Sequence, residues 1–235
     1  MKNNLKILAI IPARSGSKGL RNKNVTKLKN KPLLYYPIRA AKNSKYIDKV
    51  ILSTDSNIYA KLGLKFGAEA PFLRPKKYSL DMASSSSLIV HCINHLKSKR
   101  DYYDYLVLLE PTSPLTTSKD IDGAIKKIIL NKCTSLVSVA ASEKFSSQNF
   151  FKIRKNILNV KNIKEINFHK PRQKLKEYFM DGSIYISKAK DFIKNKSFIT
   201  NKTFGYVIKD KVKNLEIDSI EDLNYLNFKL KNKKL

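Results

Sequence analysis

Short apolar runs alternate with helical patterns over the first 140 residues, and this alternation limits the fold more than any other feature of the chain. The apolar runs are short and rich in Ile, Leu and Val, as in buried strands, at residues 5–11, 49–53, 105–109 and 135–140. The helical patterns lie between them, at residues 33–41, 57–66, 84–97 and 121–130. The alternation predicts a parallel sheet with helices on both faces.

In open sheets of this kind, ligands bind beyond the carboxyl ends of the strands. The loops expected at that edge are residues 12–24, 54–56, 110–116 and 216–219. The first of them reads PARSGSKGLRNKN, and its glycines would let the backbone approach an anion that Arg14 and Lys18 would neutralise. It matches neither GxxxxGK[ST] nor GxGxxG, so the sequence leaves a phosphate-binding loop and an ordinary basic turn both open.

Two further loops carry groups suited to binding. Residues 110–115 read EPTSPL, and their two prolines restrict the backbone while Glu110, Thr112 and Ser113 present a carboxylate and hydroxyls. Glu216 and Asp218 alternate with apolar residues, so in a strand both carboxylates would face one divalent ion. The alternatives are a weakly specific loop for the first, and an exposed strand edge or a helix cap at Asp218 for the second.

A guanidinium and a hydroxyl precede the helix expected at residues 84–97. Arg74 is followed by Pro75, and Ser85 lies in a serine run before the apolar helical pattern. Taken alone, these residues are equally compatible with a turn that has no ligand.

The pattern changes after residue 142. Residues 145–179 show no long helical period, and we expect an irregular, β-rich insertion there that either pairs with a second subunit or forms a mobile surface segment. Residues 183–187 and 206–208 resume strand character. Ser219 is placed to cap a final helix, with Glu221 and Asp222 in its first turn.

The formal net charge of +28 suggests nucleic-acid binding at first sight. The excess is mostly Lys and is spread from Lys2 to Lys234, whereas a polynucleotide site would need a localised basic stripe with interleaved aromatics. We therefore expect surface composition rather than a nucleic-acid partner. Such a positive field would still attract a polyanionic small substrate such as a nucleoside triphosphate.

Cysteine use and hydropathy indicate the compartment. Cys92 and Cys133 lack the spacing of a metal or redox site, which suits a reducing cytosol. The longest apolar run near the N-terminus is ILAII, too short for a signal peptide or a membrane span. The sequence predicts a soluble, cytoplasmic protein.

Six motifs occur in an order that is specific when taken together. They are IPARSGSKGLRNKN, LRP with SLDMASSS, LLEPTSPL, PRQ, DGSIYIS and LEIDSIEDL. From residue 7 to about 225 the chain resembles the acylneuraminate cytidylyltransferases, the CMP-sialic acid and CMP-nonulosonic acid synthetases. The resemblance implies a single domain over residues 1–235, with a Rossmann-like core similar to nucleotide-sugar pyrophosphorylases. It also implies a dimerisation subdomain inserted at 142–180, a homodimer, and CMP transfer from CTP to a 2-keto sugar acid with Mg²⁺.

The same resemblance implies roles for individual residues. The residues implied in CTP binding lie in the first loop and around the start of the helix expected at 84–97. They are Arg14, Ser17, Lys18, Lys23, Asn24, Arg74 and Ser85. Sugar binding falls to Glu110, Thr112, Ser113 and Arg172. The metal-binding acids are Glu216 and Asp218, and the residues expected to act in catalysis are Arg14, Lys18 and Asp218.

The chain also departs from the pattern of the family it resembles. The family commonly has Gln at Glu110, Arg at Thr116 and Asn at Asp181, and often Asp-x-Asp where this chain has Glu216 and Asp218. The change at Glu110 replaces an amide that can donate by a carboxylate that only accepts. This leaves open which nonulosonic acid is used, including legionaminic-type and pseudaminic-type sugars.

Two alternatives to this function stay open. In the first, the same fold acts on an eight-carbon keto acid or on another nucleotide, although the loop at 110–115 differs from the QGDEP-like loop usual in the eight-carbon enzymes. In the second, the chain is a non-catalytic nucleotide-binding homologue. Retention of Arg14, Lys18 and Asp218 argues against lost chemistry.

Overall fold

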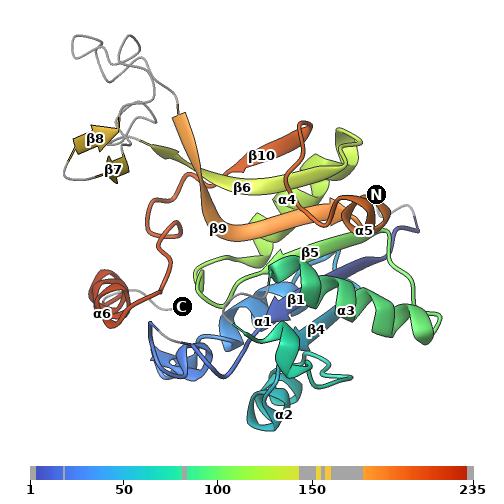
Figure 1. Cartoon of the computed structure of the whole chain (residues 1–235), viewed down its shortest axis with the longest axis horizontal. Coiled ribbons are helices and arrows are strands. Elements are labelled where there is room, and N and C mark those ends of the chain that lie inside the picture. The colour runs from blue at the N-terminus through green and yellow to red at the C-terminus, as the bar shows by residue number, and fades with distance from the viewer. Residues whose placement is uncertain are drawn as a thin grey trace.

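The structure, a computed structural model, describes residues 4–17, 19–80, 84–142, 152–154, 157–159 and 177–231. Its centre is a six-stranded sheet in the order β10-β6-β9-β5-β1-β4 (Figure 1). The strands are β1 (Ile7–Pro12), β4 (Lys49–Ser53), β5 (Tyr105–Leu109), β6 (Ser135–Ser142), β9 (Glu177–Lys188) and β10 (Thr203–Val207). β9 runs antiparallel to β5 and β6 on its two sides, and the other five strands are parallel to one another.

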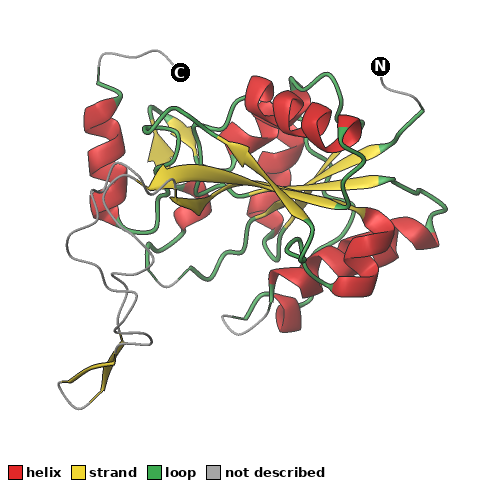
Figure 2. Ribbon diagram, turned by 90° about the horizontal axis from the view of Figure 1, so that it is seen from above, coloured by secondary structure: helices red, strands yellow, loops and turns green. Residues whose placement is uncertain are grey.

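Helices cover both faces of this sheet, as the view from above shows (Figure 2). The described residues form six α-helices, α1 (Tyr35–Lys42), α2 (Asn57–Phe66), α3 (Ser85–Ser98), α4 (Ser118–Leu130), α5 (Ala189–Asn195) and α6 (Ile220–Lys229). Side chains of β1 alternate between two apolar cores: Ile7, Ala9 and Ile11 pack with α1 and α4, whereas Leu8 and Ile10 pack with α3 and α5. This alternation confirms the predicted α/β fold with a mostly parallel sheet.

A third apolar cluster connects the C-terminal helix to two of the loops at the carboxyl edge. It consists of Leu28, Leu33, Leu115, Ile217, Leu223, Leu226 and Leu230. Ser219 caps α6 as predicted, because its Oγ accepts from the Asp222 N–H at 3.2 Å and the Asp222 carboxylate accepts from the Ser219 N–H at 2.8 Å. The packing of α6 therefore places residues 216–219 beside the loops at 20–34 and 110–116.

Two local predictions differ from the structure. The helix expected at residues 33–41 begins only at Tyr35, after Pro32 has paired with Lys27 in a short hairpin of β2 (Lys27–Leu28) and β3 (Lys31–Pro32). Residues 215–218 do not form a strand. The Ile217 N–H donates to the Thr112 carbonyl at 2.8 Å, and no strand pairs with this segment among the described residues.

The predicted insertion at 142–180 lies mostly outside the described residues. Within it, β7 (Lys152–Arg154) and β8 (Ile157–Asn159) form an antiparallel pair, which lies apart from the main sheet (Figure 1). Two short 3₁₀ helices, η1 (Lys23–Val25) and η2 (Lys76–Tyr78), complete the fold. None of the helices in the described ranges is long and apolar enough to cross a membrane.

Candidate active site

A cleft of about 410 Å³ opens at the carboxyl ends of β1, β4 and β5. It is lined by residues from the loops after β1 and β5, from the segment between α2 and α3, from the start of α3 and from the segment before α6. The predicted site residues among them are Arg14, Ser17, Lys23, Asn24, Arg74, Ser85, Glu110, Thr112 and Asp218. Most of the residues predicted from separate motifs therefore share one cavity.

The loop after β1 is held by the side chain of Asp55, by the backbone carbonyl of Ser79 and by Asn24 at its own end. The backbone N–H of Ser15 donates to Asp55 Oδ1 at 2.8 Å, and its Oγ donates to the other oxygen at 3.2 Å. Asn24 Nδ2 donates to the Arg14 carbonyl at 2.9 Å, and Arg14 Nη1 donates to the Ser79 carbonyl at 3.3 Å. These contacts keep the loop open toward the cleft, the geometry that a phosphate-binding loop requires.

Sequence reasoning did not identify Asp55 as part of this site. Its loop, residues 54–56, was expected at the ligand edge, but no residue in it was assigned a role. An acidic side chain directly after a buried strand was the available signal. Its partner Ser15 lies 40 positions away, so the contact itself could not be read from the sequence.

The 216–219 segment closes one side of the cleft. Lys23 Nζ lies 2.8 Å from Asp218 Oδ1, and the Asp218 side chain is 67% exposed. A Cβ atom at Gly19 would lie 3.0 Å from the Asp218 carbonyl oxygen, so glycine allows this close approach of the two backbones. The first loop and the acidic segment therefore meet at Lys23 and Gly19.

Arg74 forms the buried wall of the cleft. Its Nη2 donates to the Ser53 carbonyl, and its backbone N–H donates to the Thr54 carbonyl at 2.7 Å. Burial lowers the pKa of the guanidinium, while the negative charges of Asp55 and Glu110 raise it. Arg74 thus places a cation between the first loop and the loop after β5.

Glu110 lies where this cleft meets a second one. A neighbouring pocket of about 300 Å³ is also lined by Glu110 and Ser85. Burial raises the pKa of Glu110 to about 7; the nearby Lys23 and Arg74 lower it, and Glu216 raises it. No side chain in the described part of the chain forms a hydrogen bond or ion pair with its carboxylate.

The second pocket is lined by both apolar and polar side chains. The apolar ones are Ile89, Leu108, Tyr185, Phe192, Phe198 and Ile199. The polar ones are Glu110, Lys196 and Ser197 together with Ser85 and Ser86 at the first turn of α3. Such a cavity suits a ligand that has both an apolar substituent and an acidic group.

The acidic pair fits a divalent cation. Burial raises the pKa of Glu216, and the nearby Asp218 and Asp181 raise it further. The Asp218 carboxylate already pairs with a positive charge, the ammonium group of Lys23, so its position suits a bound cation. No group of three or more potential metal ligands occurs among the described residues. One or two carboxylates are what Mg²⁺ takes from a protein when phosphates supply further ligands.

Four predicted residues do not appear in the lining of either pocket: Lys18, Arg172, Ser113 and Glu216. Lys18 and Arg172 lie outside the described residues. Ser113 is buried at 1% exposure; its backbone N–H donates to the Glu110 carbonyl at 3.2 Å, and its own carbonyl accepts from Thr116. In this structure Ser113 shapes the turn behind the cleft, and a role in contacting the sugar stays a prediction.

A cleft lined by Arg, Lys and Asp218 at the carboxyl edge of the sheet is the kind of site that a nucleotide-binding α/β protein has. The fold itself is shared with solved structures. A solved structure of CMP:2-keto-3-deoxy-manno-octonic acid synthetase complexed with CTP has a TM-score of 0.70 to the chain at 15% identity. The superposition covers 97% of this chain and 100% of that one.

The family model described as Cytidylyltransferase matches residues 8–234, and the chain belongs to this family. It is 36% identical to the N-acylneuraminate cytidylyltransferase of Escherichia coli O18:K1:H7 over 92% of its length, but spans only 50% of that relative. It is 32% identical to the pseudaminic acid cytidylyltransferase of Campylobacter jejuni, covering 94% of each chain. The resemblance to acylneuraminate cytidylyltransferases, and the predicted enzyme class, are confirmed.

Proposed function

We propose that this chain transfers CMP from CTP to a nonulosonic, sialic-acid-like 2-keto sugar acid and releases pyrophosphate, for the synthesis of surface glycans. Membership of the family supports the reaction. The names of the two relatives support the substrate class, and they differ in the sugar, acylneuraminate in one and pseudaminic acid in the other.

The observation that carries the proposal is the junction of the two pockets. Ser85 and Glu110 line both cavities, so two ligands bound side by side would meet there. The first cavity has the cations that a triphosphate needs, and the second has the mixed apolar and cationic lining that suits a sugar acid. A transferase that joins a nucleotide to an acceptor requires this arrangement.

The residues act mainly by alignment and charge stabilisation. The oxygen of the acceptor's anomeric hydroxyl would attack the α-phosphorus in line and give up its proton to solvent. One P–O bond forms while the bond to the β-phosphate breaks, and pyrophosphate leaves with the electron pair of that bond. Arg14 and Lys23 would hold the triphosphate and offset the charge that develops on it. Arg74 and Ser85 would contact the cytosine and ribose, and Lys196 would pair with the acceptor carboxylate.

We further propose that Mg²⁺ acts at Glu216 and Asp218. Bound there, it would neutralise charge on the triphosphate and on the departing pyrophosphate. Lys23 would then leave Asp218 and pair with phosphate oxygens, because Mg²⁺ would replace Lys23 as the positive charge beside Asp218.

The test is a pyrophosphate-release assay with CTP, UTP, GTP and ATP against a panel of nonulosonic acids. The panel should include N-acetylneuraminate and legionaminic-type and pseudaminic-type sugars, with an eight-carbon 3-deoxy keto acid for comparison. Release that depends on CTP and on a nine-carbon acid would support the proposal. Preference for the eight-carbon acid or another nucleotide would replace it, and no release with any pair would indicate a non-catalytic homologue.

We predict that Glu110 influences the choice of sugar. Its carboxylate faces the acceptor cavity without a partner among the described residues, so the accepted sugar should present a hydrogen-bond donor there, such as an amide N–H or an ammonium group. A sugar without that donor would leave the carboxylate unpaired, which disfavours it strongly. Glu110→Gln should move the preference toward N-acetylneuraminate, measured as the ratio of kcat/KM values between sugars.

The KM for CTP serves as the internal control, because the amide keeps the shape of the nucleotide cleft. An unchanged ratio between sugars in Glu110→Gln would show that residue 110 does not determine the choice.

We also predict a homodimer. At its start, β9 extends with β6 away from the helices and exposes Tyr178, Phe179 and Met180, each about half accessible. Neighbouring exposed apolar side chains of this size are typical of an interface. Light scattering should give twice the chain mass at micromolar concentration, and an active monomer under those conditions would contradict the prediction.

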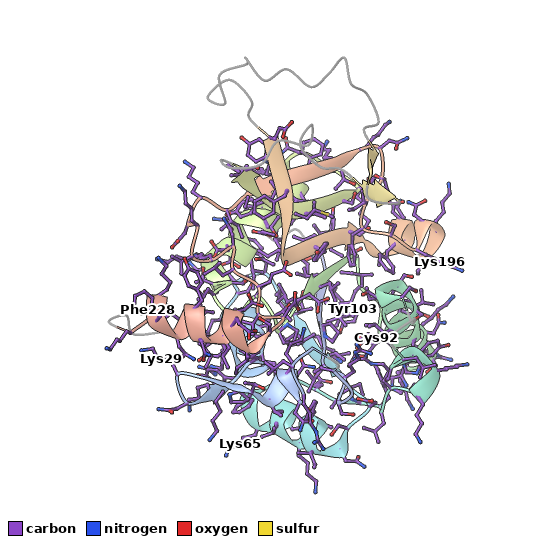
Figure 3. All side chains as sticks on the ribbon, turned by 60° about the vertical axis from the view of Figure 1, so that its left-hand side comes forward. Lys29, Lys65, Cys92, Tyr103, Lys196 and Phe228 are labelled. Atoms are coloured by element: carbon purple, nitrogen blue, oxygen red, sulfur yellow. The ribbon has the colours of Figure 1, made fainter. Side chains whose placement is uncertain are left out.

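Two further observations support a cytoplasmic enzyme with a small polyanionic substrate: the state of the cysteines and the distribution of lysines over the surface. Cys92 and Cys133 are both buried free thiols. Figure 3 places Lys29, Lys65 and Lys196 on different sides of the molecule, which favours a general positive surface over a nucleic-acid stripe.

A further inference from the structure

The middle of β9 departs from regular pairing directly beside Glu216. Val137 of β6 pairs with Tyr185 of β9, but the next pair joins Val139 to Met180. Between these pairs β6 has the single residue Ser138, whereas β9 has residues 181–184. This is a large bulge of β9 relative to β6, and bulges often redirect side chains near functional sites.

Buried hydrogen bonds hold the bulge in its shape. Ser138 Oγ donates to Asp181 Oδ1, and it accepts from the Ile184 N–H at 2.8 Å. The Ser183 N–H donates to the same carboxylate oxygen of Asp181 at 3.2 Å. Ser138, Asp181 and Ser183 are all at most 2% exposed, so these bonds are shielded from water.

The bulge brings the backbone of Gly182 against the side chain of Glu216. Gly182 has φ +70°, and a Cβ atom there would lie 1.7 Å from Glu216 Oε1 and 2.5 Å from Cδ. No side chain larger than hydrogen fits at this position unless Glu216 moves. The carboxylate of Glu216 therefore rests on the bulge, at a place created by the absence of a side chain.

We infer that the bulge at residues 181–184, through Gly182, is a positioning element that sets the carboxylate of Glu216 beside Asp218 for a divalent cation. The inference rests on the proposed function, because it takes these two acids as cation ligands. The bulge also explains how Glu can stand at position 216, where the family often has Asp. The extra methylene carries the carboxylate onto Gly182, and the missing Cβ gives it room.

The test combines Gly182→Ala with Glu216→Asp, which shortens the side chain that lies against Gly182. Gly182→Ala pushes the Glu216 carboxylate out of place, so Mn²⁺ binding with CTP present should weaken about tenfold or more, the range for lost support of a metal ligand. The Mg²⁺ concentration for half-maximal pyrophosphate release should rise in parallel. In Gly182→Ala/Glu216→Asp the carboxylate retracts by about 1.5 Å, one C–C bond. Mn²⁺ binding should then return to that of Glu216→Asp alone.

The rescue separates positioning from backbone strain, because the positive φ is the same in the single and double variants. Gly67→Ala is a matched control: Gly67 has φ +99° at the end of α2, and the three atoms nearest to a Cβ there are Lys42 side-chain carbons at 3.6–3.7 Å, an ordinary van der Waals contact. It should lower the melting temperature as Gly182→Ala does, while Mn²⁺ binding stays at the wild-type value.

Ser138→Ala tests the same geometry without adding a side chain. It removes the hydroxyl that bonds Asp181 and Ile184, and Mn²⁺ binding should weaken in the same direction. This variant decides the question if Gly182→Ala does not fold.

Mn²⁺ titration by electron paramagnetic resonance distinguishes the possible failures. Wild-type binding in Gly182→Ala, or a double variant as weak as Gly182→Ala, would overturn the inference and leave the proposed function intact; so would wild-type binding in a folded Ser138→Ala. Wild-type protein that neither binds Mn²⁺ with CTP nor releases pyrophosphate would contradict the proposed function itself.

Discussion

Asp218→Asn is expected to lose nearly all cytidylyl transfer. Asp218 lies on the nucleotide cleft and already attracts a cation, since Lys23 Nζ is 2.8 Å from its Oδ1. The amide keeps the size of the side chain but removes the negative charge that a hard divalent cation needs. Pyrophosphate release should fall close to background at saturating Mg²⁺, and Glu216→Gln should reduce it less.

Two controls accompany this variant. Glu221→Gln removes the same charge three positions away on the exposed first turn of α6, and it should keep wild-type turnover. The fold of Asp218→Asn should survive, because an ion pair of so exposed a carboxylate contributes little to stability. Full activity of Asp218→Asn, or of the wild type in excess EDTA, would end the metal assignment.

Arg14→Ala is expected to reduce turnover at least ~100-fold, the scale of losing one preorganised group that stabilises charge. The loop that carries Arg14 is held by Asp55 at Ser15 and by Asn24 at the Arg14 carbonyl. The guanidinium is therefore positioned before the triphosphate arrives, and no reorganisation is needed during the reaction. The sequence predicts the same loss for Lys18→Ala, whose position lies outside the described residues.

Arg39→Ala is the matched control, because it removes the same charge from an exposed site on α1 away from the cleft. Turnover is measured at saturating CTP and sugar, and folding is checked by circular dichroism. Near-normal turnover of a folded Arg14→Ala enzyme would refute the role given to the loop.

Local features determined much of the fold. The strands at 49–53 and 105–109 and the helix at 57–66 have the predicted bounds. The helix is defined by neighbours in sequence: Ser56 Oγ accepts from the Tyr59 N–H at 3.3 Å, and Gly67 ends the helix in the left-handed conformation. Capping and apolar periodicity act over a few residues, so they can be read directly from the chain.

The order of the strands in the sheet could not be read from local sequence patterns. Residues 183–187 have strand character, but nothing in them shows that β9 inserts antiparallel between β5 and β6. Residues 215–218 alternate like a strand, yet no strand pairs with them in the described structure. Pairing depends on which partner the rest of the fold brings alongside, and that is a non-local property.

For the site, the sequence by itself determined which residues gather at the ligand edge, because loops at the carboxyl ends of parallel strands must share one edge. It identified Arg14, Lys23 and Asp218, and the structure gathers them around one cleft. Only the tertiary structure decided how these groups are held: Asp55 on Ser15, Glu110 between two pockets, and Glu216 over Gly182. Each of these contacts joins segments far apart in sequence, so its geometry exists only once the sheet and α6 have packed.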